Sequence, residues 1–228
     1  MLVLNQFTVW GAMSPRILGC ALAAAVLIAL FIRHEVACPY PLVDLQLFRS
    51  PAFTFGGIGA ILEYALLYGM FFVVSFALVR GYGDSPEVAG MRLAVLPASL
   101  GIVASLSGGW TKRVGGRRLC ILGMSFCGVS LGWLAVCLST PALGRIADLS
   151  ALGLFGAGLG LYIAPNNHGT MEAAPPNHSG QAGALLNLLR VSGTSLGVAS
   201  TSAVLSWRLA AGGDFQIPTQ GFAGAELL

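Results

Sequence analysis

The chain has 228 residues, of which 56% are hydrophobic and only 9% are charged, and its mean hydropathy is +0.80. A soluble domain carries about 25% charged residues, so this chain lacks the polar surface that would cover a water-soluble core. The formal net charge of +3 is small and clustered, which indicates membrane topology rather than nucleic-acid binding. The composition therefore predicts an all-α polytopic membrane protein surrounded by lipid.

Long apolar runs separated by Pro- and Gly-rich breaks predict about six transmembrane helices, each near the ~20 residues that cross a bilayer. In chain order we expect them at residues 15–32, 53–79, 89–108, 119–138, 146–164 and 181–207. Pro165 is expected to end the fifth span, because proline removes a helical hydrogen bond.

The densest basic cluster lies between the third and fourth predicted spans and indicates the orientation of the chain. Its residues are Lys112, Arg113, Gly115, Arg117 and Arg118. Basic loops stay on the cytoplasmic side, so we expect this loop there. Alternation then places the loop that contains Asp84 outside, and both ends of the chain outside as well.

Three GxxxG pairs lie within predicted spans, at residues 128 and 132, 156 and 160, and 193 and 197. Glycine at this spacing lets two helix backbones approach closely in lipid. Tight helix packing is the expected role of all three pairs, and a flexible point for gating is the alternative.

Glu63 lies near the middle of the second predicted span, beside Tyr64 and one turn before Tyr68. An ionised carboxylate at that depth is costly, so the group must face a cavity, be paired or be protonated. Burial disfavours the charged form, which suits a group that takes up and releases a proton. A neutral acid bonded to a neighbouring helix is the structural alternative.

Other polar residues within the predicted spans have less specific interpretations. Asn187 and Arg190 are three apart, hence on one helix face; Arg190 either extends to the interface or meets a carboxylate or an anionic substrate group. Arg92 and Asp148 lie near predicted span ends, where an interfacial position is expected.

The sequence contains no pattern typical of catalysis or of a metal site. His168, Glu172 and His178 fall in the predicted loop between the fifth and sixth spans, without the spacing of a helical zinc motif. The five cysteines form no CxxC pair, so small buried residues are expected rather than a disulfide framework or a zinc site. We therefore expect no enzyme, no metal and no cofactor.

Several stretches, in order along the chain, resemble the major facilitator superfamily, specifically its fourteen-span drug:proton antiporter branch. They are WGAMSP at 10–15, PLVDLQLFR at 41–49, GYGDSP at 81–86 followed by AG and LP, RVGGR at 113–117, and GQAG at 180–183 followed by Asn187, Arg190 and Gly193. Lys112 departs from the resemblance, because an acidic residue is frequent at its position in the basic loop.

The resemblance implies a twelve-helix transporter core in two lobes plus two linking helices. On that mapping residues 1–50 hold an external loop, one linking helix and a cytoplasmic connector. Residues 51–208 hold most of the second lobe, and 209–228 form a polar external tail. Glu63 would lie on a helix that lines the central cavity. The first lobe and the last helix would be missing, so the chain is expected to be a fragment.

The resemblance also implies a function: exchange of protons for a small lipophilic drug or metabolite by alternating access in the plasma (inner) membrane. Glu63, Tyr64, Tyr68, Asn187 and Arg190 would then belong to the proton and substrate pathway. One lobe alone would not transport, so a separate first lobe or another copy is the expected partner. The alternative is a membrane subunit that does not transport, or a decayed, truncated transporter.

Overall fold

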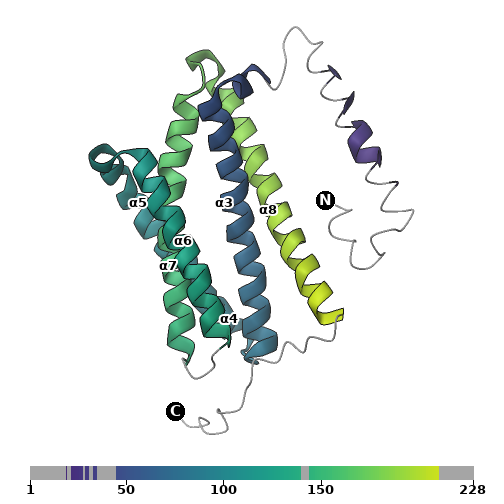
Figure 1. Cartoon of the computed structure of the whole chain (residues 1–228), viewed down its shortest axis with the longest axis vertical. Coiled ribbons are helices and arrows are strands. Elements are labelled where there is room, and N and C mark those ends of the chain that lie inside the picture. The colour runs from purple at the N-terminus through teal and green to yellow at the C-terminus, as the bar shows by residue number, and fades with distance from the viewer. Residues whose placement is uncertain are drawn as a thin grey trace. The chain divides into compact units, whose positions relative to one another are not determined.

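The computed structural model describes residues 45–139 and 144–210, together with short helical stretches at 19, 22–27, 29–30 and 33–34. Every element from residue 45 onward in this described part is helical (Figure 1). In chain order the elements are η1 (Leu45–Arg49), α3 (Pro51–Phe76), η2 (Ala77–Gly81), α4 (Pro86–Leu93), α5 (Val95–Val114), α6 (Gly116–Ser139), α7 (Gly144–Glu172), η4 (Pro176–His178) and α8 (Ser179–Ala210). The predicted all-α class is confirmed.

Four helical segments are long and apolar enough to cross a membrane, among the residues that the structure describes. They are Pro51–Gly81, Pro86–Val114, Gly116–Cys137 and Ala147–Glu172, and they correspond to the second to fifth predicted spans. The sixth predicted span is confirmed as helix α8, but Asn187, Arg190 and many small polar residues lower its hydropathy, so its role as a span stays a prediction. Half of the predicted first span, and residues 211–228 of the predicted tail, lie outside the described residues.

The predicted end of the fifth span at Pro165 is wrong. Helix α7 contains Pro165 and continues to Glu172. Proline is tolerated within membrane helices where neighbouring groups compensate for the lost hydrogen bond. Pro165 is buried, and its Cβ lies 3.6 Å from the position that a Cβ on Gly116 of α6 would occupy. Packing against α6 therefore accompanies the continued helix.

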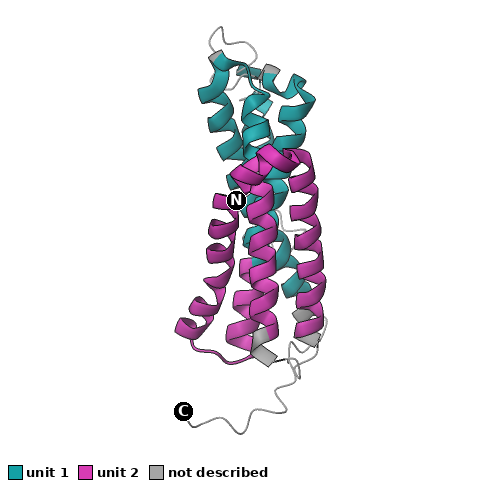
Figure 2. Cartoon of the chain, turned by 90° about the vertical axis from the view of Figure 1, so that its left-hand side faces the viewer, with its two compact units in different colours: residues 1–70, 167–211 teal, residues 71–166, 212–228 magenta. Residues whose placement is uncertain are grey.

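The described chain forms two compact units, one that includes residues 45–70 and 167–210 and the other formed by residues 71–139 and 144–166 (Figure 2). In the second unit α7 packs against both α5 and α6. The buried Ser130 hydroxyl of α6 donates a hydrogen bond of 2.6 Å to the Ala151 carbonyl of α7, and Trp133 Nε1 donates one of 3.1 Å to Ser150 Oγ. These bonds fix the register between α6 and α7.

Glycines allow the close approach of helices in this second unit. A Cβ on Gly160 would lie 2.7 Å from the Leu100 carbonyl oxygen of α5, and one on Gly158 would lie 2.7 Å from the Gly123 carbonyl oxygen of α6. The predicted packing role of the pair at 156 and 160 is therefore confirmed. For Gly128 and Gly132 the packing role stays a prediction, because a Cβ on either would meet no described atom within 4 Å.

Candidate functional site

The first unit is organised around a close, parallel pair of helices, α3 and α8, which lie side by side in Figure 1. A Cβ on Gly193 would lie 2.9 Å from Ile61 Cα, and one on Gly197 would lie 2.7 Å from Ala65 Cα. The contacting positions advance by four residues on both helices at once, which shows that the helices run in the same direction. We call these contacts the α3–α8 seam. They confirm the packing role predicted for the third GxxxG pair.

Two more contacts extend the seam in the same register. A Cβ on Gly57 would lie 2.8 Å from Leu189 Cδ1, and one on Gly69 would lie 3.0 Å from Thr201 Cγ2. Close contact therefore continues over three helical turns of α3, and it holds this helix at a fixed rotation about its own axis. The rotation decides where the side chains between the contacts point.

The beginning of α3 is fixed by its own sequence and by a small core. Ser50 Oγ accepts a long hydrogen bond of 3.5 Å from the Phe53 amide, and Pro51 occupies the first helical position, where its missing N–H costs nothing. Leu47 and Phe53 are buried with Ala182 and Leu185 of α8. Both seam helices are thereby held together at this end.

Glu63 lies on α3 between two seam residues, Ile61 and Ala65. Its side chain is 0% exposed, and neither carboxylate oxygen has a hydrogen-bond partner among the described residues. Two positions along a helix correspond to a rotation of about 200°, so Glu63 points to the side of α3 opposite Ile61, which packs on α8. A carboxyl group buried without partners carries its charge at a high free-energy cost, so this environment favours the neutral acid.

Arg190 is the cationic residue that the structure associates with Glu63. Its charge acts on the Glu63 carboxyl, but the two side chains do not share a hydrogen bond. The Arg190 guanidinium carbon lies 5.8 Å from the centre of the Tyr64 ring, within the range of a cation–π interaction. The guanidinium is therefore held beside the seam, where it influences Glu63 through space.

The remaining residues of the predicted pathway lie near this group or apart from it. Tyr68 stacks on Tyr64 with ring centroids 6.2 Å apart and an interplanar angle of 21°, and Tyr68 is 39% exposed. Asn187 is exposed on α8, one turn before Arg190. The structure thus brings Glu63, Tyr64, Tyr68 and Arg190 together, and leaves Asn187 outside the group.

The predicted basic loop is a one-residue link between two helices. Gly115 ends α5 with φ +90°, and its amide donates to the Thr111 carbonyl at 3.0 Å; a positive φ is favourable only for glycine. Lys112 and Arg113 lie in the last turn of α5, where cations complement the helix dipole. Arg117 and Arg118 open α6, and all four basic side chains are exposed.

Two of the residues predicted in the loop after the fifth span lie on α7 instead. His168 Nδ1 and Glu172 Oε2 are 3.3 Å apart, one turn from each other, and both side chains are mostly exposed. His178 Nδ1 lies 3.0 Å from Gln181 Oε1 at the start of α8. The exposed His168–Glu172 pair contributes little stability.

The sequence did not predict a cluster of charged residues in the second unit. Arg92 Nη1 forms an ion pair of 2.6 Å with Asp84 Oδ2, and Asp148 is only 4% exposed. Arg92 is therefore ion-paired and Asp148 is buried within the protein, while the interfacial position expected for both residues stays a prediction. The proximity of residues so far apart in the chain left no local signal in the sequence.

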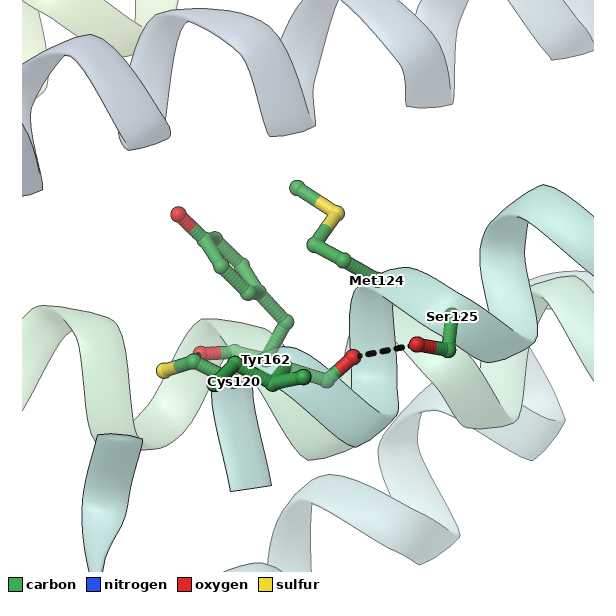
Figure 3. A pocket seen from close by; sticks show the side chains of 5 residues that line it. Cys120, Met124, Ser125 and Tyr162 are labelled. Carbon is green, nitrogen blue, oxygen red and sulfur yellow. Dashed lines mark hydrogen bonds between the residues drawn. The ribbon is translucent and has the colours of Figure 1, made fainter. Parts of the chain in front are cut away.

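A depression of about 460 Å³ lies in the second unit, lined by Cys120, Ile121, Met124 and Ser125 of α6 and by Tyr162 of α7. Figure 3 shows the Tyr162 ring and the Met124 side chain projecting to the same side, while Ser125 Oγ donates to the Ile121 carbonyl at 2.9 Å. The five described side chains that line the depression are uncharged, so it offers a mostly apolar surface.

The four helical segments long and apolar enough to cross a membrane, among the described residues, define the chain as a multi-pass α-helical membrane protein. Comparison with protein families gives a narrower assignment, because the model of the Major Facilitator Superfamily matches residues 17–198. The chain belongs to this superfamily, and the expected resemblance is confirmed. Members of the superfamily are transporters and not enzymes, which agrees with the expected absence of catalysis.

Curated relatives come from several bacteria. Multidrug resistance protein Stp of Mycobacterium tuberculosis is 31% identical over 82% of this chain and 34% of its own length. Drug efflux pump JefA of the same species is 31% identical over 81% of this chain and 36% of its own length. Riboflavin transporter RibZ of Clostridioides difficile is 26% identical over 88% of this chain and 44% of its own length. The chain thus spans between a third and a half of the length of these relatives.

Proposed function

We propose that this chain supplies the second lobe of a proton-coupled exporter of small lipophilic compounds in the plasma (inner) membrane. The observation that carries the proposal is Glu63, a carboxyl group buried in a membrane-spanning helix without any hydrogen-bond partner among the described residues. An ionisable group kept at such a cost in the membrane is a default candidate for a proton or ion pathway.

The relatives support export rather than uptake as the direction of transport. Two of those named above are a multidrug resistance protein and a drug efflux pump. A third is a riboflavin transporter, which supports keeping metabolites beside drugs among the proposed substrates. The substrate of this chain is accordingly proposed as a class, namely small lipophilic molecules with a planar or cationic part.

In the proposed mechanism Glu63 alternates between a neutral, buried acid and an ionised carboxylate. Ionisation requires compensation, which water, a rearranged Arg190 or a cationic substrate would supply when the site opens. The Tyr64–Tyr68 stack offers aromatic surface for a planar or cationic substrate. Substrate binding and proton release would then be coupled, because both depend on the charge state of Glu63.

Alternating access requires two lobes that move around a central site. We therefore propose that residues 51–208 act together with a first lobe from a separate chain or from another copy. On this mapping residues 1–50 connect the lobes through a linking helix, residues 209–228 lie outside, and the basic cluster around Gly115 faces the cytoplasm. A chain without a first lobe would not transport.

The proposal is tested by co-expressing this chain with a first lobe and measuring dye transport into everted vesicles under an imposed pH gradient. Wild type, Glu63→Gln and Glu172→Gln are compared at equal protein levels. Glu172 is a matched control, because it is an exposed acid outside the proposed pathway. We expect transport by wild type and by Glu172→Gln, and none by Glu63→Gln.

Two other outcomes of this assay reject parts of the proposal. Transport that survives Glu63→Gln removes Glu63 from the proton pathway. Absence of transport in wild type, across a panel of cationic and neutral dyes and with both chains present in the membrane, favours a membrane subunit that does not transport or a decayed transporter.

A further inference from the structure

A second buried acid lies in the unit formed by residues 71–166, apart from the proposed pathway group. Asp148 stands in the first turns of α7 and is 4% exposed. Neither of its carboxylate oxygens has a hydrogen-bond partner of good geometry among the described residues. A group this deeply buried needs either a compensating charge or a proton.

The groups around Asp148 come from two helices and from the segment that follows η2. Tyr82, in the segment after η2, lies within reach of a hydrogen bond to Asp148. Arg92 of α4 acts on Asp148 through its charge, and Cys137 of α6 lies near enough to interact with it as well. We call Tyr82, Asp84, Arg92 and Asp148 the acidic cluster.

Within the acidic cluster, as far as its side chains are described, one cation stands against two acids. Arg92 provides one positive charge and is already engaged by Asp84 at 2.6 Å. The side chains of that ion pair are only 13% and 4% exposed. With Asp148 ionised, the four residues of the cluster carry a net charge of −1, since Arg92 is the one guanidinium among them. With Asp148 protonated, these four residues are neutral.

Tyr82 is suited to be a hydrogen-bond donor in this cluster. Burial, and next the negative charge of Asp148, raise the pKa of the Tyr82 phenol to about 12. The phenol therefore keeps its proton at every physiological pH, and it remains able to donate to Asp148 in both charge states of the acid.

We propose that Asp148 is a second proton-binding site, and that its occupancy controls how tightly the segment from Tyr82 to Arg92 is held against α7. Burial of the neutral cluster has a low free-energy cost, so proton binding favours the state in which the segment from Tyr82 to Arg92 contacts α7. Loss of the proton leaves an uncompensated charge, which is stabilised when water enters and the segment separates from α7.

The proposed orientation gives this device a role in the exchange cycle, and only this step rests on the proposed function. The segment from Tyr82 to Arg92 would lie at the external face, because the basic cluster would lie at the cytoplasmic one. A low external pH would then hold the segment against α7, and a high external pH would favour its separation from α7. The site would report external pH to the lobe independently of Glu63.

Hydrogen exchange of the chain in lipid nanodiscs tests this proposal without substrate, gradient or first lobe. Amide protection of residues 80–93 is measured between pH 5.5 and 8, with labelling times scaled to the intrinsic exchange rate. If one proton controls the contact, the opening equilibrium rises up to about tenfold per pH unit above the midpoint. Since the vesicle assay has a different readout, failure of either proposal is distinguishable from failure of the other.

Variants make the assignment specific to Asp148. We expect Asp148→Asn to keep the segment protected at all pH values, because the amide is always neutral, and Glu87→Gln, an exposed neighbour, to behave as wild type. Tyr82→Phe removes the donor that stabilises the ionised acid, so the midpoint should move about one unit to higher pH. Wild-type protection that is independent of pH, an unchanged slope in Asp148→Asn, or an unchanged midpoint in Tyr82→Phe would each overturn the proposal.

Discussion

The α3–α8 seam makes a quantitative prediction about Gly197. A methyl group there would lie 2.7 Å from Ala65 Cα and 2.8 Å from the Ala65 carbonyl carbon, whereas carbon atoms in contact prefer about 3.5–4.0 Å. These atoms belong to the backbone of α3, so no side chain can rotate away. The helices must separate by about 1 Å, which forfeits packing along the seam.

Overpacking of this kind costs about 1–3 kcal/mol, but alanine also gains about 1 kcal/mol over glycine in helix propensity. A matched control variant cancels the gain in helix propensity. Gly132→Ala on α6 gains the same propensity and meets no described atom within 4 Å. The difference in unfolding free energy between the two variants therefore isolates the steric cost, which we expect to be about 1–3 kcal/mol in favour of Gly132→Ala.

Thermal unfolding in nanodiscs, followed by tryptophan fluorescence, measures this difference. At about 2–4 °C per kcal/mol for a chain of this size, Gly197→Ala should unfold at least ~2 °C below Gly132→Ala. A larger residue, as in Gly197→Leu, should widen the gap. Equal midpoints for Gly197→Ala and Gly132→Ala would refute the close approach of α3 and α8.

Substitutions at three further positions test other contacts by the same thermal assay. Tyr64→Leu removes the ring that faces Arg190 at 5.8 Å and should lower stability by about 0.5–2 kcal/mol, whereas Tyr64→Phe keeps the ring and should not; equal effects would argue against a cation–π contact. Ser130→Ala removes the 2.6 Å bond to Ala151 and should cost about 0.5–1.5 kcal/mol; an unchanged midpoint would contradict a bond that fixes α6 on α7. His168→Ala should have almost no effect, since its ion pair is exposed, and a large loss would show that the pair is structural.

The sequence predicted the helices better than their ends. Apolar runs mark bilayer spans clearly, because lipid admits only backbones that satisfy their own hydrogen bonds. The polar run after Pro165 resembled a loop, yet α7 continues through it to Glu172. Local composition did not reveal that Pro165 is buried against α6, where tertiary packing compensates for an unfavourable residue.

The two candidate sites also differed in how well the sequence predicted them. Glu63 was recognisable because it is a single carboxylate in a long apolar run, and the structure buries it. The acidic cluster was not recognisable, since Asp84, Arg92 and Asp148 each lie near a span end, where charged residues are ordinary. Only the folding of the segment after η2 over the start of α7 brings them together.

The central claim is that proton movement and substrate movement are coupled through Glu63. The most direct measurement is the recovery of a pH-sensitive dye in acid-loaded everted vesicles when substrate is added, with this chain and a first lobe present. We expect substrate-dependent loss of the pH gradient in wild type and in Glu172→Gln, and none in Glu63→Gln. Proton release by Glu63→Gln at the wild-type rate would contradict it.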